Sequence, residues 1–168
     1  MSTDIFLSYA SEDTSKAVEL ARVLQSDGWS VWWDRNISPG QDFEIEIDMA
    51  LSQARAVVVL WSVFSVSSNW VRNEAREAKE ANKLIPVMLD EARIPLSYRS
   101  LNTIDLRQWP DKQSLLEISM FKSAVSRVLH NGVSGQMLKK PATTEEMTFS
   151  VRVASRVADM VAGRKSND

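Results

Sequence analysis

The sequence predicts an α/β domain: a three-layer sandwich with a parallel sheet of five strands between helices, followed by a C-terminal helical extension. Two observations predict it. Short apolar runs alternate with amphipathic stretches of helical spacing, and this order repeats about five times along the chain. The run Ala56–Trp61 is continuously apolar and rich in β-branched residues, as is typical of a parallel strand buried on both faces. Ligands of such sheets bind at the carboxyl ends of the strands, so the loops after the strands are the place to look for a site.

The predicted elements follow one another in a regular order. Asp13 is a candidate N-cap of the first helix, and Gly28 is a candidate stop after it. Pro86 lies inside the fourth strand, and because proline donates no hydrogen bond to a ladder, the neighbours of that strand stay open. We expect strands at residues 5–9, 29–33, 56–61, 84–89 and 103–106, and helices at residues 14–26, 43–51, 67–82 and 115–129.

The alternating pattern ends after the last of these helices. Residues 131–142 contain glycine, lysine and proline and are predicted to form a linker. Residues 143–168 open with a sequence typical of a capping box and continue with apolar residues at helical spacing. We therefore predict a domain of residues 1–130, a linker, and a C-terminal helix and tail too short to be a domain. This segment either packs on the core or leads toward a partner or a longer parent protein.

Composition excludes several classes of function. The formal net charge is −2, so no overall basic field attracts nucleic acid or anionic lipid. We expect a cytoplasmic protein, since no apolar run approaches the roughly 20 residues that span a bilayer and no secretory signal opens the sequence. The absence of cysteine excludes disulfides, zinc–thiolate sites and a cysteine nucleophile. The only histidine, His130, lies away from the strand ends, so neither a Ser-His pair nor a histidine-based metal site is expected.

Four of the six tryptophans fall near predicted strand ends: Trp33, Trp61, Trp70 and Trp109. Because the carboxyl ends of parallel strands lie along one edge of a sheet, these rings are candidates to line a single cleft. Aromatic faces suit planar ligands such as a nucleobase or a pyridinium. The alternative is that they are large core residues, which is the better explanation for any one of them taken alone.

Glu74 is a candidate functional residue. It follows Trp70 by four positions on a predicted helix, so the two side chains share a face near the first turn. Its other neighbours at helical spacing are Val71, Glu77 and Ala78, none of which is basic. A carboxylate beside an indole and a like charge is expected to have a raised pKa, which is typical of functional sites. The alternative is an ordinary surface glutamate.

Polar residues also follow the first two strands. Residues 8–13, with the sequence SYASED, offer hydroxyls and carboxylates where a substrate can sit, although helix capping explains some of them equally well. Asp34 and Arg35 end the second strand and begin a loop that contains a Pro-Gly pair. The alternative there is a turn with a surface ion pair, worth about 0–1 kcal/mol.

Four segments in the right order resemble the Toll/interleukin-receptor (TIR) domain. Residues 4–9, DIFLSY, resemble the opening motif of that family, and residues 28–34, GWSVWWD, resemble its second strand. Residues 37–43, ISPGQDF, are similar to the long loop that follows. Residues 65–74, SVSSNWVRNE, resemble the helix-start motif with Trp-x-x-x-Glu. The resemblance covers about residues 3–130 and is greatest to the prokaryotic branch.

The resemblance implies a flavodoxin-like fold and one of two activities. Many bacterial, plant and some animal TIR domains cleave NAD+ at the nicotinamide–ribose bond, in immune or antiphage signalling. Others are non-catalytic scaffolds that assemble through the loop after the second strand. Either activity implies homo-oligomers held by TIR–TIR contacts and, as further partners, other TIR or sensor proteins.

The resemblance also implies roles for individual residues. Glu74 matches the catalytic glutamate, with Trp70 and Phe43 in the nicotinamide site. One departure from the family is that residues 10–13 include no basic residue, which some members use there. With Trp33 added for its position at a strand end, the expected substrate-binding residues are Ser8, Tyr9, Ala10, Trp33, Arg35, Phe43, Ser65 and Trp70.

A single carboxylate suits this chemistry. The nicotinamide of NAD+ leaves a cationic pyridinium as a neutral molecule, so no general acid is needed, whereas an ordinary glycosidase uses two carboxylates. One carboxylate can stabilise the oxocarbenium-like ribosyl group. NAD+ is then the substrate, and no cofactor or metal is expected. Water would give ADP-ribose and internal attack a cyclic isomer, and the sequence leaves both open. A phosphoreceiver on the same fold is disfavoured, because Leu60, Trp61 and Ser62 stand where it needs an aspartate.

Overall fold

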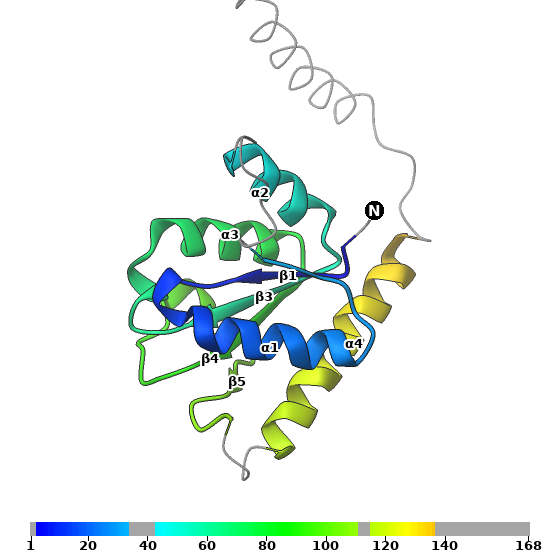
Figure 1. Ribbon diagram of the computed structural model, residues 1–168. Helices are drawn as coiled ribbons and strands as arrows, with labels where there is room; N and C mark the ends of the chain where they lie inside the picture. Colours follow the sequence, from blue (N-terminus) through cyan, green and yellow to red (C-terminus); the bar gives the residue numbers. More distant parts are fainter. Residues whose placement is uncertain (1–2, 34–42, 111–114, 137–168) are drawn as a thin grey trace, which may run out of the picture. The chain divides into compact units, whose positions relative to one another are not determined.

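The computed structural model describes residues 3–33, 43–110 and 115–136, apart from the side chains of Phe43 and of residues 132–136. Five strands form one parallel sheet in the order β2-β1-β3-β4-β5, which confirms the predicted fold class (Figure 1). The strands are β1 (Ile5–Ser8), β2 (Val31–Trp32), β3 (Ala56–Trp61), β4 (Leu84–Met88) and β5 (Ile104–Asp105). The helices are α1 (Thr14–Ser26), α2 (Phe43–Gln53), α3 (Asn69–Glu80) and α4 (Leu115–Gln136), with short 3-10 turns at Ser11–Asp13, Ser65–Ser67 and Leu96–Tyr98.

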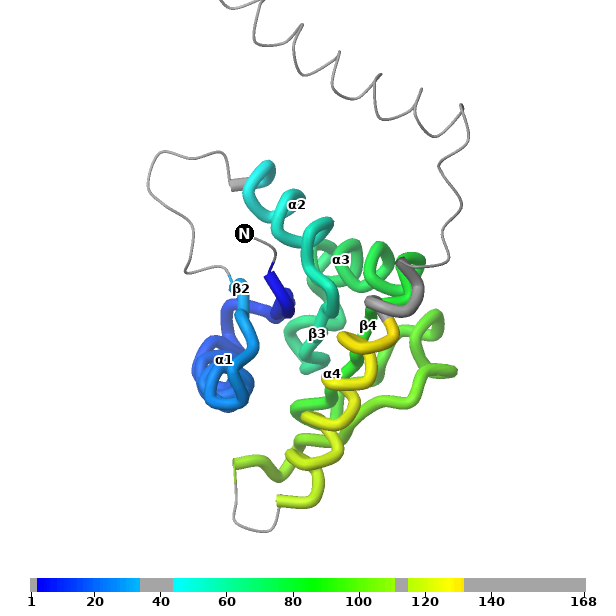
Figure 2. The backbone as a smooth tube through the Cα atoms, turned by 90° about the vertical axis from the view of Figure 1, so that its right-hand side faces the viewer, coloured from blue at the N-terminus to red at the C-terminus, as the bar shows by residue number. Residues whose placement is uncertain are grey.

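The helices cover the sheet on both faces and make three layers. The cluster of buried residues on one face takes side chains from α1 and α4, such as Leu20 and Phe121. The cluster on the other face takes side chains from α2 and α3, such as Leu51 and Ala75. Figure 2 shows α2 and α3 side by side, with α1 apart from them. The sheet is therefore closed to solvent on both faces, as a parallel sheet requires.

The central strand β3 explains why both layers form. Its six residues are all buried, and they alternate between the two clusters. Val58 and Leu60 point toward α1 and α4, whereas Val57, Val59 and Trp61 point toward α2 and α3. Burying one such side chain stabilises the fold by about 1.5–3 kcal/mol, so a strand that is apolar on both faces needs a cover on each. In β1 likewise, Phe6 points toward α2 and α3, whereas its neighbours Ile5 and Leu7 point toward α1 and α4.

Most predicted boundaries agree with the structure, and one is wrong. α1 and β3 begin and end at the predicted residues, and Gly28 follows α1 with a positive φ of 88°. The last helix, predicted over 115–129, continues to Gln136 and so enters the segment predicted as a linker. Glycine in a helix costs about 1 kcal/mol relative to alanine, which is too little by itself to end one.

The domain boundaries of residues 1–130 and 131–142 remain predictions. The chain divides into a unit of residues 1–132 and a unit of residues 133–168. Of the second unit, the structure describes the end of α4. The predicted C-terminal helix of residues 143–168 lies outside the described residues.

Pro86 is accommodated in an internal strand. β4 lies between β3 and β5, and Val59 pairs with Pro86 in the ladder with β3. The carbonyl of Met88 accepts a hydrogen bond from Leu106, on the β5 side. Because alternate residues of a strand point to the same side, the nitrogen of Pro86 also faces β5. β5 pairs only from Val87 onward, so the missing N–H removes no bond from the ladder.

Lys83 joins α2 to the start of β4. Its ammonium donates hydrogen bonds to three carbonyls at the end of α2, those of Leu51, Ser52 and Ala54, at 2.7, 3.2 and 3.1 Å. A cation at this position complements the negative end of the helix dipole. Burial lowers the pKa of Lys83. The contact holds the end of α2 close to the sheet edge at which β3 and β4 begin and at which α3 ends.

Asp4 links the starts of three strands. Its carboxylate accepts hydrogen bonds from the backbone N–H and the hydroxyl of Ser30, just before β2, at 2.9 and 2.8 Å. It also accepts one from Arg55, just before β3, at 2.8 Å. A second nitrogen of Arg55 donates to the carbonyl of Leu129 in α4. Burial alone would raise the pKa of Asp4, but the hydrogen bonds from Ser30 and Arg55 outweigh it and lower the pKa overall.

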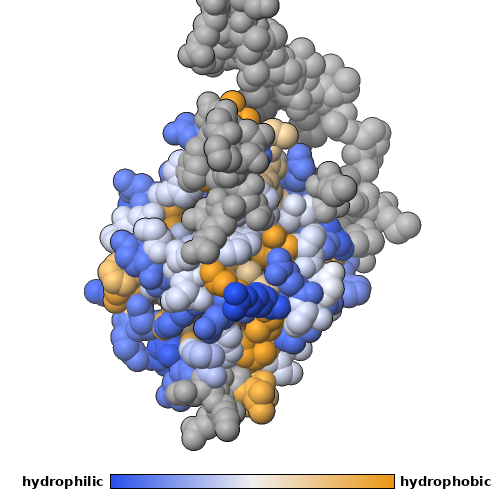
Figure 3. All heavy atoms as spheres, in the orientation of Figure 1, coloured by the Kyte–Doolittle hydropathy of each residue, from blue (hydrophilic) through white to orange (hydrophobic). Residues whose placement is uncertain are grey.

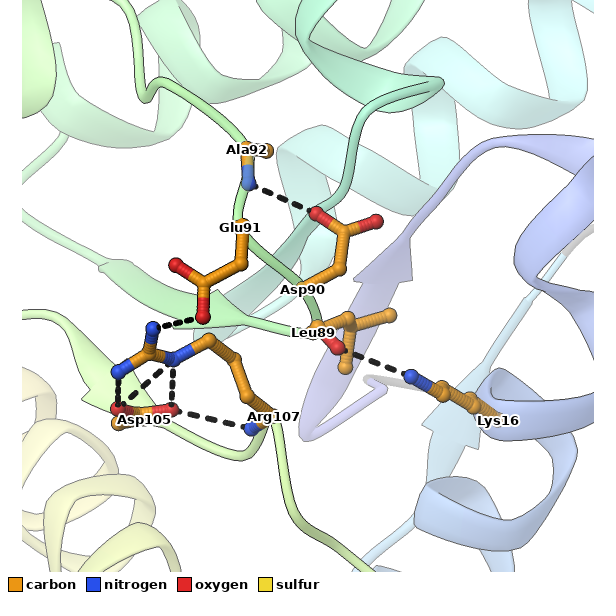
Figure 4. A network of polar contacts seen from close by, with 7 residues as sticks. All are labelled: Lys16, Leu89, Asp90, Glu91, Ala92, Asp105 and Arg107. Atoms are coloured by element: carbon orange, nitrogen blue, oxygen red, sulfur yellow. Dashed lines mark hydrogen bonds and ion pairs between the residues drawn. The ribbon is translucent and has the colours of Figure 1, made fainter.

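A second polar network fastens the carboxyl ends of β4 and β5 (Figure 4). The Arg107 guanidinium lies between the carboxylates of Asp105 and Glu91, and its hydrogen bonds lower the pKa of Asp105. Lys16 of α1 donates to the carbonyl of Leu89 at 2.9 Å. These contacts are exposed or partly exposed, so we expect them to place the loops and to add little stability.

The surface is mixed in polarity. On the face seen in Figure 3, hydrophilic side chains surround smaller hydrophobic patches. Among the described residues, no helix has the length and apolar character needed to cross a membrane.

Replacing Asp4 with asparagine tests the strand-linking network. Because the folded-state pKa of Asp4 lies below its ordinary value of 3.8, its stabilisation is present above that value and is lost as the pH falls through the folded pKa. We expect Asp4→Asn to lower the free energy of unfolding by about 1 kcal/mol at pH 7. The difference from wild type should shrink below pH ~4, and urea denaturation at several pH values measures it. Glu19→Gln changes an exposed carboxylate of α1 and serves as the control.

Candidate active site

A cavity of about 450 Å³ opens at the carboxyl end of β1, between the loop that follows this strand and the start of α3. Its position agrees with the rule that ligands of parallel sheets bind at the carboxyl edge. We call it the Glu74 cavity. Its lining residues are Phe6, Leu7, Ser8, Tyr9, Ala10, Ser11, Glu12, Trp32, Ile47, Phe64, Ser67, Ser68, Trp70, Val71 and Glu74.

Glu74 is a buried carboxylate in this cavity. It lies on α3 and is 7% exposed. One of its oxygens, Oε2, accepts a hydrogen bond of 2.5 Å from the hydroxyl of Ser8, at the end of β1. Glu74 therefore has a hydrogen-bond partner that its neighbours at helical spacing did not indicate. Its neighbours within α3 include no basic residue, but the fold brings a hydroxyl to it from 66 positions away in the sequence.

The N-terminus of α3 faces the same cavity. Ser68 is the N-cap, and its hydroxyl accepts a hydrogen bond from the backbone N–H of Val71. Trp70 follows in the first turn and is 41% exposed. The start of a helix carries a partial positive charge, which favours anionic groups. The cavity thus combines a buried carboxylate, an indole ring and a positive helix end.

A second cavity, of about 430 Å³, lies between α2 and α3. We call it the α2–α3 cavity. It shares Ile47, Trp70 and Glu74 with the Glu74 cavity, so the two spaces adjoin the same carboxylate. Its other lining residues are Glu44, Ile45, Asp48, Leu51, Asn73, Arg76 and Glu77.

Comparison with known proteins decides the family. Residues 5–118 match the family described as TIR domain, which is well over half of the chain. The chain belongs to the TIR domain family.

One curated relative of this TIR domain is bacterial. It is the 2′ cyclic ADP-D-ribose synthase BtTIR of Bacteroides thetaiotaomicron, which is 34% identical over 91 residues. The match covers 50% of this chain and 32% of the relative. The chain therefore corresponds to about a third of that protein's length.

Solved structures support the fold. The TIR domain of the Toll-related receptor TRR-2 from Hydra magnipapillata matches with a TM-score of 0.63 and 19% identity, over 75% of this chain and 98% of the other. A TIR-STING receptor from C. gigas matches with a TM-score of 0.55 and 24% identity, over 68% of this chain and 39% of the other. At such identities the likeness concerns the fold alone.

The structure brings some of the residues predicted from the TIR resemblance together. Five of them line the Glu74 cavity: Ser8, Tyr9, Ala10, Trp70 and Glu74. Phe43 begins α2, and its side chain lies outside the described residues, as does Arg35 altogether.

Two predicted residues do not line the cavity. Ser65 is fully buried, and its hydroxyl accepts a hydrogen bond from the backbone of Ser62. It therefore helps to shape the loop between β3 and α3. Trp33 packs against the core on the α1 and α4 side of the sheet. Their role in binding substrate remains a prediction.

The expected cleft of four tryptophans is wrong. Trp61 is fully buried and packs on Tyr98, with ring centres 5.1 Å apart. Trp109 is buried in the cluster on the opposite face of the sheet. Of the four, only Trp70 is among the lining residues of the Glu74 cavity. Trp61 lies on the same face of the sheet as Trp32 but is fully buried, and Trp109 follows β5 and packs on the other face, so a position near a strand end does not by itself bring rings together.

The sequence analysis missed Trp32. It lines the cavity and stacks on Phe6, with ring centres 4.9 Å apart and ring planes 13° from parallel. The available signal was alternation: if Val31 points into the core with α1, then Trp32 points to the other face. Ile47, Phe64 and the α3 cap also line the cavity, and they carried no signal beyond helical spacing or loop position.

Asp13 connects two loops that border the cavity. It occupies the N-cap position of α1, as predicted, but its side chain does not cap the helix. Its carboxylate accepts a hydrogen bond of 2.5 Å from the hydroxyl of Ser62, after β3. That hydroxyl also accepts hydrogen bonds from the backbone of Phe64 and Ser65. The loop that carries Phe64 is thereby tied to the loop after β1.

The described residues show no metal site. Across residues 3–33, 43–110 and 115–136, no group of three or more histidine, aspartate or glutamate side chains is arranged to hold a metal ion. None of the described residues that line the Glu74 cavity is basic either. A ligand's negative charge would therefore meet the start of α3.

The pH dependence of an Asp13→Asn variant tests the buried acid. Burial raises the pKa of Asp13, and the nearby Asp90 adds to the rise, although the Ser62 hydrogen bond opposes it. A folded-state pKa above the ordinary 3.8 means that ionisation costs stability as the pH rises through this range. Asparagine cannot ionise and still accepts from Ser62. We therefore expect Asp13→Asn to gain up to about 1 kcal/mol on wild type between pH 3 and pH 7, measured by denaturation. A constant difference across that range contradicts the prediction.

Proposed function

We propose that this TIR domain cleaves NAD+ at the bond between nicotinamide and ribose, as an NAD+ nucleosidase that releases ADP-ribose or a cyclic isomer of it. Glu74 acts as the catalytic carboxylate. The observation that carries the proposal is the burial of this one carboxylate beside Trp70 in a cavity at the carboxyl edge of the sheet.

The proposed reaction requires few catalytic groups from the protein. The bond from the ribose carbon to the pyridinium nitrogen breaks, and its electron pair stays on that nitrogen, so nicotinamide leaves uncharged. Positive charge then develops on the ribosyl group, and a carboxylate placed in a poorly hydrated cavity stabilises it more than it would in water. Addition of water with loss of a proton gives ADP-ribose, whereas addition of an atom from the adenosine end gives a cyclic product.

The other cavity features suit parts of this substrate. Trp70 contributes an indole to the cavity lining, and an aromatic ring favours a flat cation such as the nicotinamide ring. The start of α3 offers partial positive charge to the diphosphate, in place of the basic residue that some TIR domains carry after the first strand. Arg35, from the segment before α2, and Phe43, the first residue of α2, are proposed to complete the site.

A relative supports the proposal. BtTIR, whose name describes a cyclic ADP-ribose synthase, shares 34% identity over 91 residues. An enzyme of that kind forms a product in which the ribose has lost its nicotinamide. The likeness favours an NAD-processing enzyme over a TIR domain that only assembles.

Replacing Glu74 tests the proposal. We expect purified wild-type protein to release nicotinamide from NAD+, and Glu74→Ala and Glu74→Gln to lose at least about a thousandfold in turnover. Glutamine keeps an oxygen that accepts from Ser8, so this variant separates loss of charge from loss of the buried contact. Chromatography of the products measures both nicotinamide and its companion, which identifies hydrolysis or cyclisation.

The control is Glu80→Ala, an exposed carboxylate on the same helix that should leave activity unchanged. Retained turnover in folded Glu74→Gln contradicts the assignment of Glu74 as the catalytic carboxylate. A wild-type protein that consumes no NAD+ at high concentration with a crowding agent favours the alternative of a TIR scaffold.

Self-association is proposed to activate the enzyme, through TIR–TIR contacts in which a neighbour completes the site. A head-to-tail contact of this kind can extend into filaments. We therefore expect the rate of NAD+ consumption to rise more steeply than linearly with protein concentration. Initial rates over a wide concentration range measure this, and a strictly linear dependence contradicts it.

A further inference from the structure

We infer that Ser8 is a positioning residue for Glu74: its hydroxyl holds the carboxylate in the orientation that the reaction needs. This inference rests on the proposed function and assigns to Ser8 a role other than the substrate contact that the family resemblance implies. A substrate contact would act on binding, whereas a positioning residue acts on the chemical step.

The hydrogen bond between the two residues carries the inference. The Ser8 hydroxyl lies 2.5 Å from Glu74 Oε2, and the bond is buried. Ser8 is 2% exposed and Glu74 is 7% exposed, so water competes poorly for either group. In such surroundings a hydrogen bond to a charged group is strong and directional.

The two residues come from elements that do not move easily. Ser8 is the last residue of β1, where it pairs with Val59 of the central strand β3. Glu74 lies in the second turn of α3, whose neighbours Val71 and Ala75 are buried in the core. The bond thus ties the helix that carries the carboxylate to the middle of the sheet. A site held by rigid elements keeps its geometry better than one held by loops.

The direction of this hydrogen bond, from Ser8 to Glu74, also affects the ionisation of the carboxylate. The Ser8 hydroxyl donates its proton to the carboxylate, and such a bond favours the ionised form of the acid. The proposed reaction needs that form, because a protonated carboxyl would not stabilise a developing positive charge. Ser8 therefore fixes the orientation of the Glu74 carboxylate and favours its ionised form.

Other serines at the site do not share this contact. The Ser67 hydroxyl donates to the carbonyl of Phe64, and the Ser68 hydroxyl caps α3. Ser65 and Ser62 bond to each other in the loop between β3 and α3. The Ser8 hydroxyl, by contrast, donates to the proposed catalytic carboxylate.

A graded series at position 8 tests the inference in the full chain. Ser8→Ala removes the donor and should lower kcat about 10- to 100-fold with little change in KM, because misplacing a catalytic group acts on the chemical step. Ser8→Cys replaces the hydroxyl with a somewhat larger and weaker donor and should show an intermediate loss. Ser8→Thr keeps the hydroxyl and should recover most of the turnover. Ser26→Ala, which removes an exposed hydroxyl at the end of α1, is the control.

The pH profile separates positioning from a merely structural role. Without the hydroxyl, ionisation of Glu74 is less favoured, so the acid limb of kcat/KM in Ser8→Ala should move to higher pH. Thermal unfolding of each variant confirms that the protein is folded at the assay temperature. If Ser8→Ala does not fold, Ser8→Cys takes its place. A turnover below that of wild type and Ser8→Thr, together with an acid limb of kcat/KM at higher pH, then supports the inference.

Three outcomes overturn it, and they differ from failure of the proposed function. A raised KM with unchanged kcat makes Ser8 a substrate contact. Reduced kcat with an unmoved acid limb and no recovery in Ser8→Thr makes its role structural. Unchanged kinetics in Ser8→Ala and Ser8→Cys remove any role. Wild-type protein without NAD+ cleavage instead overturns the proposed function, and the role of Ser8 in turnover with it.

Discussion

The structure depends on the burial of β3 on both faces. Its six apolar residues alternate between two clusters, and each cluster needs a layer of helices to exclude water. Because helices occupy both faces of such a sheet, its loops lie at the two edges where the strands begin and end. The carboxyl edge then becomes the place where side chains of β1, the β3–α3 loop and α3 can meet around a ligand, and the Glu74 cavity lies there.

Polar contacts between distant segments then position that edge. Asp4 holds the starts of the strands together, whereas Asp13 and Ser62 join the loops that leave their ends. The bond from Ser8 to Glu74 belongs to the same set, since it ties α3 to β1 across the site. Each of these bonds is small in energy beside the apolar core, but each fixes a direction that apolar packing leaves free. Packing therefore sets the layers, and hydrogen bonds set the geometry of the cavity.

The proposed chemistry requires few catalytic groups. A leaving group that departs uncharged removes the need for a general acid, so one carboxylate and a dry aromatic surface suffice. That requirement agrees with a chain that contains no cysteine and a single histidine. The α2–α3 cavity is also lined by Glu74 and Trp70, so the carboxylate adjoins two cavities.

The sequence by itself determined the layer order, the elements α1 and β3, the TIR resemblance and Glu74 as a candidate, because apolar periodicity and short motifs are local properties. Only the tertiary structure decided which aromatic residues meet at the site. Trp61 and Trp109 lie in the core, whereas Trp32 lines the cavity. Trp61 is on the same face of the sheet as Trp32 but packs on Tyr98, and Trp109 follows β5 and packs on the other face. The partner of Glu74 was also invisible in the sequence, because helical spacing reports neighbours within α3, whereas Ser8 reaches it across the sheet.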